Sequence, residues 1–197
     1  MRWLSALLTV LTLLSGCVQP TPPVTDATRA PYPGSAEFAG WAAASDGCGN
    51  KRAEILRISS SAPVTYDRLG SSCTVDTGRW LDPYTGKAFT DDDDIDIDHV
   101  IPKKWAWEHG AWSWSPEMRE RFANDNQNLL AVEDSANRSK SDRGPDEWMP
   151  PLASYGCTYI NLFVSLVAKY DLQLSPSEDR EYDRLQEESC RDSTPLI

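Results

Sequence analysis

Long apolar runs, basic residues and histidines are all scarce in this sequence, and each shortage excludes a class of protein. One apolar run, Trp3–Leu14, is about 12 residues long, which is short of the roughly 20 that span a bilayer. The 19 lysine and arginine residues face 30 aspartate and glutamate residues, which gives a net charge of −11. A broad basic face for tight binding of nucleic acid is therefore not expected. Only two histidines are present, His99 and His109, and no Cys-x-x-Cys pair marks a zinc site.

The N-terminal segment has the pattern of an export signal. Arg2 precedes the apolar run, which ends in Leu14-Ser15-Gly16-Cys17, a sequence similar to the lipobox of bacterial lipoproteins. This pattern predicts a signal peptide over residues 1–16 and a lipid on Cys17, with an ordinary secretory signal as the alternative. Both interpretations place the mature protein outside the cytoplasm, either anchored to the bacterial cell envelope through its lipid alone or secreted.

The rest of the chain divides into a linker and one folded domain. Residues 17–34 are rich in proline and threonine and have no apolar pattern that could form a core. As a partly extended tether at ~3.1 Å per residue, this segment would hold the domain up to about 50 Å from the lipid. Residues 35–197 are long enough for a single domain with its own core.

The remaining cysteines predict disulfide bonds. Removing Cys17 from the five cysteines leaves an even number, as expected in an oxidising compartment. Cys48, Cys73, Cys157 and Cys190 permit three pairings. The most local of these joins Cys48 to Cys73 and Cys157 to Cys190, and each bond would contribute about 3–4 kcal/mol in the chain-entropy model.

Helical and strand patterns alternate along the folded part, which predicts an α+β domain. Ser115-Pro116-Glu117 has the N-cap, proline and acidic residue that begin a helix, and Ser175-Pro176-Ser177-Glu178 is a capping box. Strands are predicted between residues 65 and 82, over 95–101 and over 128–132. Helices are predicted over 35–60, 116–123, 135–142, 159–170 and 176–190.

A set of polar residues from Asp98 onward has the composition that metal-assisted hydrolysis of a phosphodiester requires. Asp98 is next to His99; Asn128 and Asn137 follow, nine residues apart, and Lys140 comes three residues after the second. A cation on the phosphodiester reduces its negative charge and stabilises the leaving oxygen. A neutral imidazole, with an ordinary pKa of about 6.5, can take the proton of the attacking water.

This set resembles a known family. Asp98-His99-Val100-Ile101-Pro102, followed by Asn128-Leu129 and by Asn137 with Lys140, is similar to the HNH endonucleases in the variant with asparagine at the final motif position. The resemblance extends from about Cys48 to Cys190 and is closest to secreted bacterial HNH proteins. Further matching segments are Trp80-Leu81-Asp82-Pro83-Tyr84-Thr85-Gly86, Gly110-Ala111-Trp112, Arg121-Phe122-Ala123-Asn124-Asp125 and Gly144-Pro145 with Trp148.

The resemblance implies a ββα-metal motif inside a mainly helical, disulfide-containing domain. It implies that Asp98 and Asn137 are ligands of one divalent cation. His99 would be the general base, and Asn128 the residue that orients it. Hard oxygen ligands favour Mg²⁺, with Mn²⁺ or Ca²⁺ as alternatives.

The expected substrate is nucleic acid. Lys140 lies one helical turn after Asn137 and is a candidate for a contact with substrate phosphate, as is Arg138. The implied activity is endonucleolytic hydrolysis of DNA with little sequence preference, leaving a 5′-phosphate. No obligate protein partner is predicted.

The course of the strand at 95–101 decides which carboxylate can join His99. Neighbouring residues on a regular strand point to opposite faces, so Asp98 would share a face with Asp96 and not with His99. Asp98 and His99 can serve one site where the strand bends, and Pro102 is a reason for a bend. If the strand stays regular, Asp96 becomes the better ligand.

Other functions remain open at this point. A ribonuclease or a nucleotide phosphodiesterase would use the same residues. A non-catalytic calcium-binding surface lipoprotein would instead bind its ion at the run Asp91-Asp92-Asp93-Asp94-Ile95-Asp96. That run lacks the glycine and terminal glutamate of an EF-hand loop and is typical of a solvated acidic turn. His109 has no motif around it and is predicted to be a structural or surface residue.

Overall fold

The computed structural model of the protein describes residues 30–67 and 73–191. The predicted signal peptide, the predicted lipidation site Cys17 and residues 18–29 of the predicted linker lie outside the described residues. The described part mixes helices and strands along the chain, which confirms the predicted α+β class. Within these residues, no helix is both long enough and apolar enough to cross a membrane.

The N-terminal part of the domain is less helical than its sequence predicts. A 3₁₀ helix, Ser35–Phe38, is followed by an extended segment and then by α1, Lys51–Ser59. The prediction of one helix across this region is therefore wrong for the residues in between. Gly47 and Gly49 have φ values of 76° and 81°, a left-handed backbone that interrupts a helix. The side chain of Asn50 then caps α1.

A three-stranded antiparallel sheet follows α1. Its strands, in spatial order, are β1, Thr65–Tyr66; β2, Val75–Leu81; and β3, Ala88–Asp91. In the turn after β2 the carboxylate of Asp82 accepts from the N–H of Tyr84 at 3.1 Å. This turn directs the Tyr84 side chain into the interior, where it is fully buried.

The unit that contains the predicted site is a pair of strands followed by a helix. β4, Ile95–His99, pairs antiparallel with β5, Leu129–Glu133, and α4, Asp134–Lys140, follows β5 directly. The pairing is in regular register along all of β4. The segment between the two strands contains α2, Lys103–Glu108, and α3, Pro116–Ala123. The predicted strand, insertion, strand and helix are all present, although α2 was not predicted.

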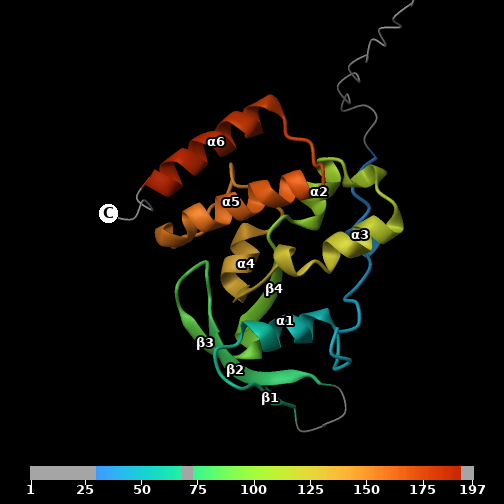
Figure 1. The fold of residues 1–197 in the computed structure, drawn as a ribbon, viewed down its shortest axis with the longest axis vertical. Coiled ribbons are helices and arrows are strands. Elements are labelled where there is room, and N and C mark those ends of the chain that lie inside the picture. The colour runs from blue at the N-terminus through green and yellow to red at the C-terminus, as the bar shows by residue number, and fades with distance from the viewer. Residues whose placement is uncertain (1–29, 68–72, 192–197) are drawn as a thin grey trace, which may run out of the picture.

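Two long helices complete the chain, α5, Ala153–Lys169, and α6, Pro176–Cys190. The predicted capping box at the start of α6 is present. One disulfide joins Cys157 to Cys190 and a second joins Cys48 to Cys73, which is the most local pairing. Figure 1 shows α5 and α6 side by side at one end of the molecule, the sheet of β1, β2 and β3 at the other, and β4 with α4 between them.

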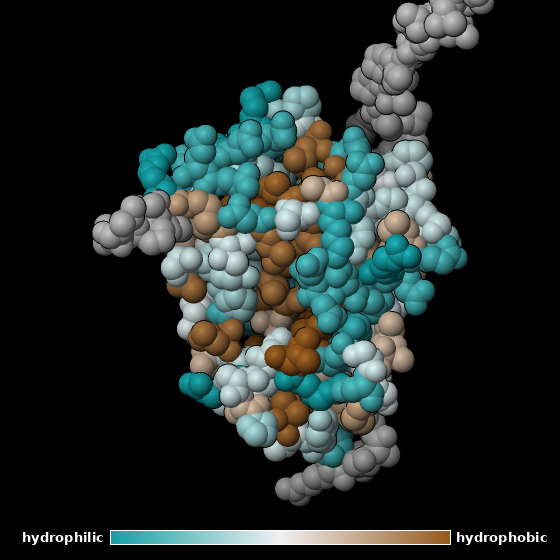
Figure 2. Space-filling view, in the orientation of Figure 1, coloured by the Kyte–Doolittle hydropathy of each residue, from teal (hydrophilic) through white to brown (hydrophobic). Residues whose placement is uncertain are grey.

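Two apolar clusters form the core. One contains buried side chains of α2, α3, α5 and α6, and the other joins α1 and β2 to β4 and β5. Ile97 of β4 belongs to the second cluster and Val132 of β5 to the first, so the strand pair lies between the clusters. Hydrophilic side chains cover α6 and α3 on the face shown in Figure 2, with a strip of apolar side chains between them.

Candidate active site

A cavity of about 360 Å³ lies at the end of β4, and it brings together three of the four residues predicted for catalysis and metal binding. Asp98, His99 and Asn137 all line it. β4 is regular through His99, the case in which Asp96 was expected to be the better ligand, but Asp98 lines the cavity and Asp96 is not among its lining residues. Both strand faces reach the cavity because His99 is the last residue of β4.

Asp98 is buried and has two partners. Its Oδ2 accepts from the hydroxyl of Tyr84 at 2.6 Å, and its Oδ1 accepts from the ammonium of Lys140 at 3.0 Å. Burial raises the pKa of the Asp98 carboxyl, whereas the neighbouring ammonium and the Tyr84 hydroxyl act in the opposite direction. Burial likewise lowers the pKa of Lys140, against the attraction of Asp98. The two groups form a hydrogen-bonded ion pair inside the protein.

The position of Lys140 corrects its predicted role. The sequence made Lys140 a candidate for contact with substrate phosphate, but its side chain is 0% exposed. Its ammonium donates to Asp98 and, at 2.8 Å, to the backbone carbonyl of His99. A lysine enclosed in this way cannot reach a phosphate outside the protein, so its role here is to neutralise Asp98.

Asp96 and Asn137 are in direct contact. Asp96 shares the face of β4 on which Asp98 lies, and its Oδ2 accepts from Asn137 Nδ2 at 3.0 Å. The hydrogen bond uses the amide nitrogen of Asn137 and leaves the amide oxygen as the atom that could coordinate a cation. Asp96 therefore fixes the orientation of the Asn137 amide.

The imidazole of His99 is held by its edge and by one face. Its Nε2 lies 2.9 Å from the carbonyl oxygen of Ala123, and its ring is stacked on Trp41 with 5.6 Å between ring centroids and 11° between planes. A carbonyl only accepts, so this bond requires the proton on Nε2 and leaves the lone pair on Nδ1. Burial and then the positive charge of Lys103 lower the pKa of His99, which favours the neutral ring.

Asn128 acts on the chain after β4. Its side chain is fully buried; Oδ1 accepts from the N–H of Ile101 at 2.8 Å, and its backbone carbonyl accepts from the N–H of Val100 at 2.9 Å. These bonds fix the turn that immediately follows His99. Asn128 therefore positions the backbone next to His99, whereas the imidazole itself contacts Ala123 and Trp41.

The remaining predicted residues lie away from the cavity. Arg138 is exposed and pairs with Asp134 one turn earlier on α4. His109 is half-buried, with its ring nitrogens facing the carbonyl of Trp105 and the carboxylate of Glu178, which agrees with a structural residue. In the acidic run, Asp92 forms an ion pair with Arg52, although Asp91, Asp92 and Asp93 are close enough together to hold a cation.

The donor atoms at the cavity fit a hard divalent cation. A carboxylate has about four lone-pair positions, of which Tyr84 and Lys140 use two on Asp98. Asn137 could contribute an amide oxygen from α4. Aspartate and amide oxygens, completed by water, suit Mg²⁺ better than a closed zinc site. The cation would lie on the cavity side of Asp98 and Asn137.

Several residues of this site carry no signal in the sequence. Tyr84 and Lys103 reach the site through the fold, and Ala123 contributes only its backbone carbonyl. Trp41 is 58 residues before His99 and stacks on it because of the path of the N-terminal segment. Tyr84 and Ala123 do lie within segments that resemble the family, but those segments did not indicate which atoms contact the site.

The fold and the site define an α+β domain with a strand–strand–helix unit that presents a histidine, a carboxylate and an amide to one cavity. Residues 52–184 match the family of GmrSD restriction endonucleases, C-terminal domain, and the chain belongs to this family. The chain is also 39% identical over 173 residues to a protein of Arthroderma benhamiae named as an uncharacterized secreted protein. That alignment covers 86% of this chain and 79% of the other. No solved structure matches the chain.

Proposed function

We propose that the protein is a metal-dependent endonuclease of the HNH type that hydrolyses phosphodiester bonds in DNA. The observation that carries this proposal is the meeting of Asp98, Asn137 and His99 at one cavity on a strand–strand–helix unit. Membership in a family of restriction endonuclease domains supports the same class of activity. The residue types and their surroundings supply the rest of the mechanism.

His99 is the general base of the proposed reaction. Its Nδ1 takes a proton from the attacking water, and the Ala123 carbonyl continues to accept from Nε2 as the ring becomes positively charged. Proton transfer of this kind contributes about 10²–10⁴ in rate. A divalent cation held by Asp98 and Asn137 would stabilise the charge on the phosphate and on the leaving oxygen.

Lys103 takes the place of Lys140 as the proposed contact with phosphate. It lines the same cavity as His99, and its ammonium lies 5.7 Å from the centre of the Trp41 ring. The other lysines of the chain each form an ion pair with a carboxylate, whereas Lys103 has no such partner within the described residues. Burial lowers the pKa of Lys103, because the charged ammonium loses part of its hydration. A bound phosphate would offset this desolvation cost.

The proposed setting is outside the cytoplasm. Two disulfides within the described residues fit an oxidising compartment, and the relative from Arthroderma benhamiae is named as secreted. The export signal and lipid anchor expected from residues 1–17 agree with this setting. The acidic net charge of −11 predicts weak non-specific affinity, so substrate would be held mainly at the cavity.

Cleavage and metal binding measured on the same variants test the proposal. We expect His99→Ala to bind Mg²⁺ or Mn²⁺ like the wild type in calorimetry and to lose at least about 10²-fold in plasmid cleavage. Asp98→Ala should lose both. His109→Ala is the matched control, because it removes a half-buried imidazole outside the cavity and should keep cleavage.

Cleavage by His99→Ala at the wild-type rate would show that the role assigned to His99 is wrong. Comparison of plasmid DNA, RNA and a mononucleotide diester in the same assay separates the proposed activity from a ribonuclease or a nucleotide phosphodiesterase. Loss of ion binding in a variant of Asp91 and Asp93, with none in Asp98→Ala, would favour a calcium-binding surface protein instead.

A further inference from the structure

We propose that Trp41 and Asn124 are positioning residues that hold the imidazole of His99 in one orientation. Trp41 stacks on the ring of His99, and Asn124 bonds to the backbone on either side of Trp41. The proposal rests on the proposed role of His99 as general base. It is carried by contacts of the segment Gly40–Ala42 and of the end of α3.

A single hydrogen bond does not fix an imidazole ring. The bond from His99 Nε2 to the Ala123 carbonyl decides which nitrogen carries the proton, but the ring can still swing about the line of that bond. Stacking on a second ring removes that freedom, because it sets the plane of the imidazole. Trp41 does this with an interplanar angle of 11°.

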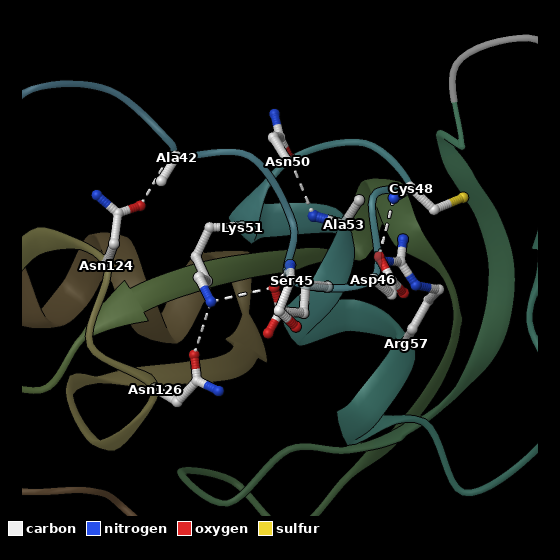
Figure 3. A network of polar contacts seen from close by, with 11 residues as sticks. Ala42, Ser45, Asp46, Cys48, Asn50, Lys51, Ala53, Arg57, Asn124 and Asn126 are labelled. Atoms are coloured by element: carbon white, nitrogen blue, oxygen red, sulfur yellow. Dashed lines mark hydrogen bonds and ion pairs between the residues drawn. The ribbon is translucent and has the colours of Figure 1, made fainter.

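Asn124 holds the backbone on both sides of Trp41. Its Oδ1 accepts from the N–H of Ala42 at 2.8 Å, and its Nδ2 donates to the carbonyl of Gly40 at 3.3 Å. Figure 3 shows Asn124 reaching from the end of α3 to Ala42 of the N-terminal segment. Because Gly40 and Ala42 flank Trp41, the two bonds determine where the indole lies.

Asn124 is itself fixed by the helix that supplies Ala123. It is the C-cap of α3, and its Nδ2 also donates to the carbonyl of Glu120 at 3.0 Å. The residue that holds Trp41 therefore directly follows the residue that accepts from His99. One short segment, Ala123–Asn124, thus controls both the edge and the face of the imidazole.

The N-terminal segment is also held independently of Trp41, which makes the role of the ring separable from that of the backbone. The N–H of Lys51 donates to the carbonyl of Ala42 at 2.8 Å, and its ammonium donates to Asn126 at 3.1 Å, as Figure 3 shows. The indole also packs beside the second apolar cluster. Apart from its stacking on His99, the indole therefore contacts this cluster and the Lys103 ammonium.

Substitutions of Trp41 distinguish the two roles by kinetics. Trp41→Leu keeps an apolar side chain but has no ring to stack, whereas Trp41→Phe keeps a ring. We expect Trp41→Leu to lower kcat on DNA by about 10- to 100-fold with KM within about twofold, because misplacement of a reacting group by about 1 Å can cost 10²-fold. Trp41→Phe should restore kcat to within about threefold of the wild type.

Two further variants complete the comparison. Asn124→Ala should lower kcat like Trp41→Leu, and the Trp41 variants decide the question if Asn124→Ala does not fold. Trp112→Leu is the matched control, because Trp112 is also partly buried and packs on the other apolar cluster. It should leave kcat and KM unchanged.

Nitrogen chemical shifts of ¹⁵N-labelled histidine test the positioning without reference to cleavage. In the wild type at neutral pH, His99 should show one neutral tautomer with its proton on Nε2. A ring that is free to swing loses its bond to the Ala123 carbonyl for part of the time, so Trp41→Leu and Asn124→Ala should give shifts averaged between the two nitrogens, while the shifts of His109 stay constant. Unchanged His99 shifts in both variants would overturn this proposal. Changed shifts in a protein without nuclease activity would instead overturn the proposed function alone.

Discussion

Lys140 and Lys103 lie near the same cavity, but their surroundings differ. Lys140 is fully buried and bonded to Asp98 and to the backbone of His99. Lys103 is half-buried, faces the cavity and has no carboxylate partner among the described residues. The surroundings of Lys140 are typical of a cation that neutralises a buried carboxylate. Those of Lys103 are typical of a cation that binds an anionic ligand.

Substitution of each lysine by methionine should therefore affect different properties. Lys140→Met removes the cation but leaves the Asp98 carboxylate buried beside Tyr84. The free energy of unfolding should fall by about 3–5 kcal/mol, the usual cost of an uncompensated buried charge. Lys103→Met should leave stability within about 0.5 kcal/mol. It should weaken DNA binding and reduce the salt dependence of binding by about one phosphate contact.

Urea denaturation and DNA-binding titrations over a range of salt concentrations measure both effects. Lys87→Met is the control, because Lys87 is largely exposed and its ion pair with Glu133, at 3.6 Å, should contribute at most about 1 kcal/mol. If Lys140→Met lost less than about 1 kcal/mol, the Asp98 carboxylate would not depend on its partner. Unchanged salt dependence in Lys103→Met would contradict the phosphate contact.

For the individual residues of the site, the sequence predicted the residue types better than their contacts. Asp98, His99 and Asn137 could be selected because chemistry requires those types and they follow one another in a recognisable pattern. Lys140 could not be identified from the sequence as the partner of Asp98 in the same way. Whether a lysine one turn after Asn137 faces solvent or the interior depends on how α4 packs on β4, which residue spacing does not determine.

Among the elements, α6 is joined through its first turn to the end of α2 by a partly buried polar contact. Glu178 of the capping box accepts from the N–H of Ser175 at 2.7 Å and also pairs with His109, which follows the last residue of α2, at 2.8 Å. Burial acts to raise the pKa of Glu178, but its hydrogen bonds to His109 and Ser175 hold that pKa at about 2. Glu178 therefore stabilises the folded state only while it is ionised.

This pKa predicts how stability depends on pH. An unfolded glutamate has a pKa of about 4.3, so the stabilisation from Glu178 is fully present above that pH and is lost as the pH falls toward 2. We expect Glu178→Gln to be less stable than the wild type at pH 6, with the difference shrinking by pH 2.5. Thermal unfolding at the two pH values measures the difference.

Glu187→Gln is the control for this measurement, because Glu187 is exposed on the same helix. Its stability relative to the wild type should be the same at both pH values. A difference between the wild type and Glu178→Gln that did not change with pH would contradict the contribution assigned to the Glu178 carboxylate.

The elements also show where sequence patterns succeed. The cap signals at Ser115 and Ser175 predicted the starts of α3 and α6 because they depend on neighbouring residues alone. The helix predicted over 35–60 was largely wrong. The apolar pattern belongs to α1 alone, and the helix does not continue N-terminal to it because Gly47 and Gly49 have a left-handed backbone. α2 was missed, since its aromatic residues have no clear helical period and its burial comes from contacts with distant helices.

In the whole molecule, the cavity that contains Asp98 and His99 lies at the boundary between the two apolar clusters. β4 and β5 separate the clusters, and α4 closes the unit on which Asp98 and Asn137 lie. The two disulfides link segments within each half of the chain, Cys48 with Cys73 and Cys157 with Cys190. The central unit is thereby supported from both sides, which would allow a site with a buried ion pair to keep its geometry.

Dependence of DNA cleavage on a divalent cation is the most direct test of the proposed metal-dependent nuclease. Purified protein with its disulfides intact would be incubated with supercoiled plasmid in Mg²⁺, in EDTA, and in EDTA followed by excess Mg²⁺. We predict nicking and linearisation in Mg²⁺, no cleavage in EDTA and recovery on addition of excess Mg²⁺. Cleavage in EDTA at the rate seen with Mg²⁺, or no cleavage of nucleic acid with any divalent cation, would contradict the proposed metal-dependent nuclease.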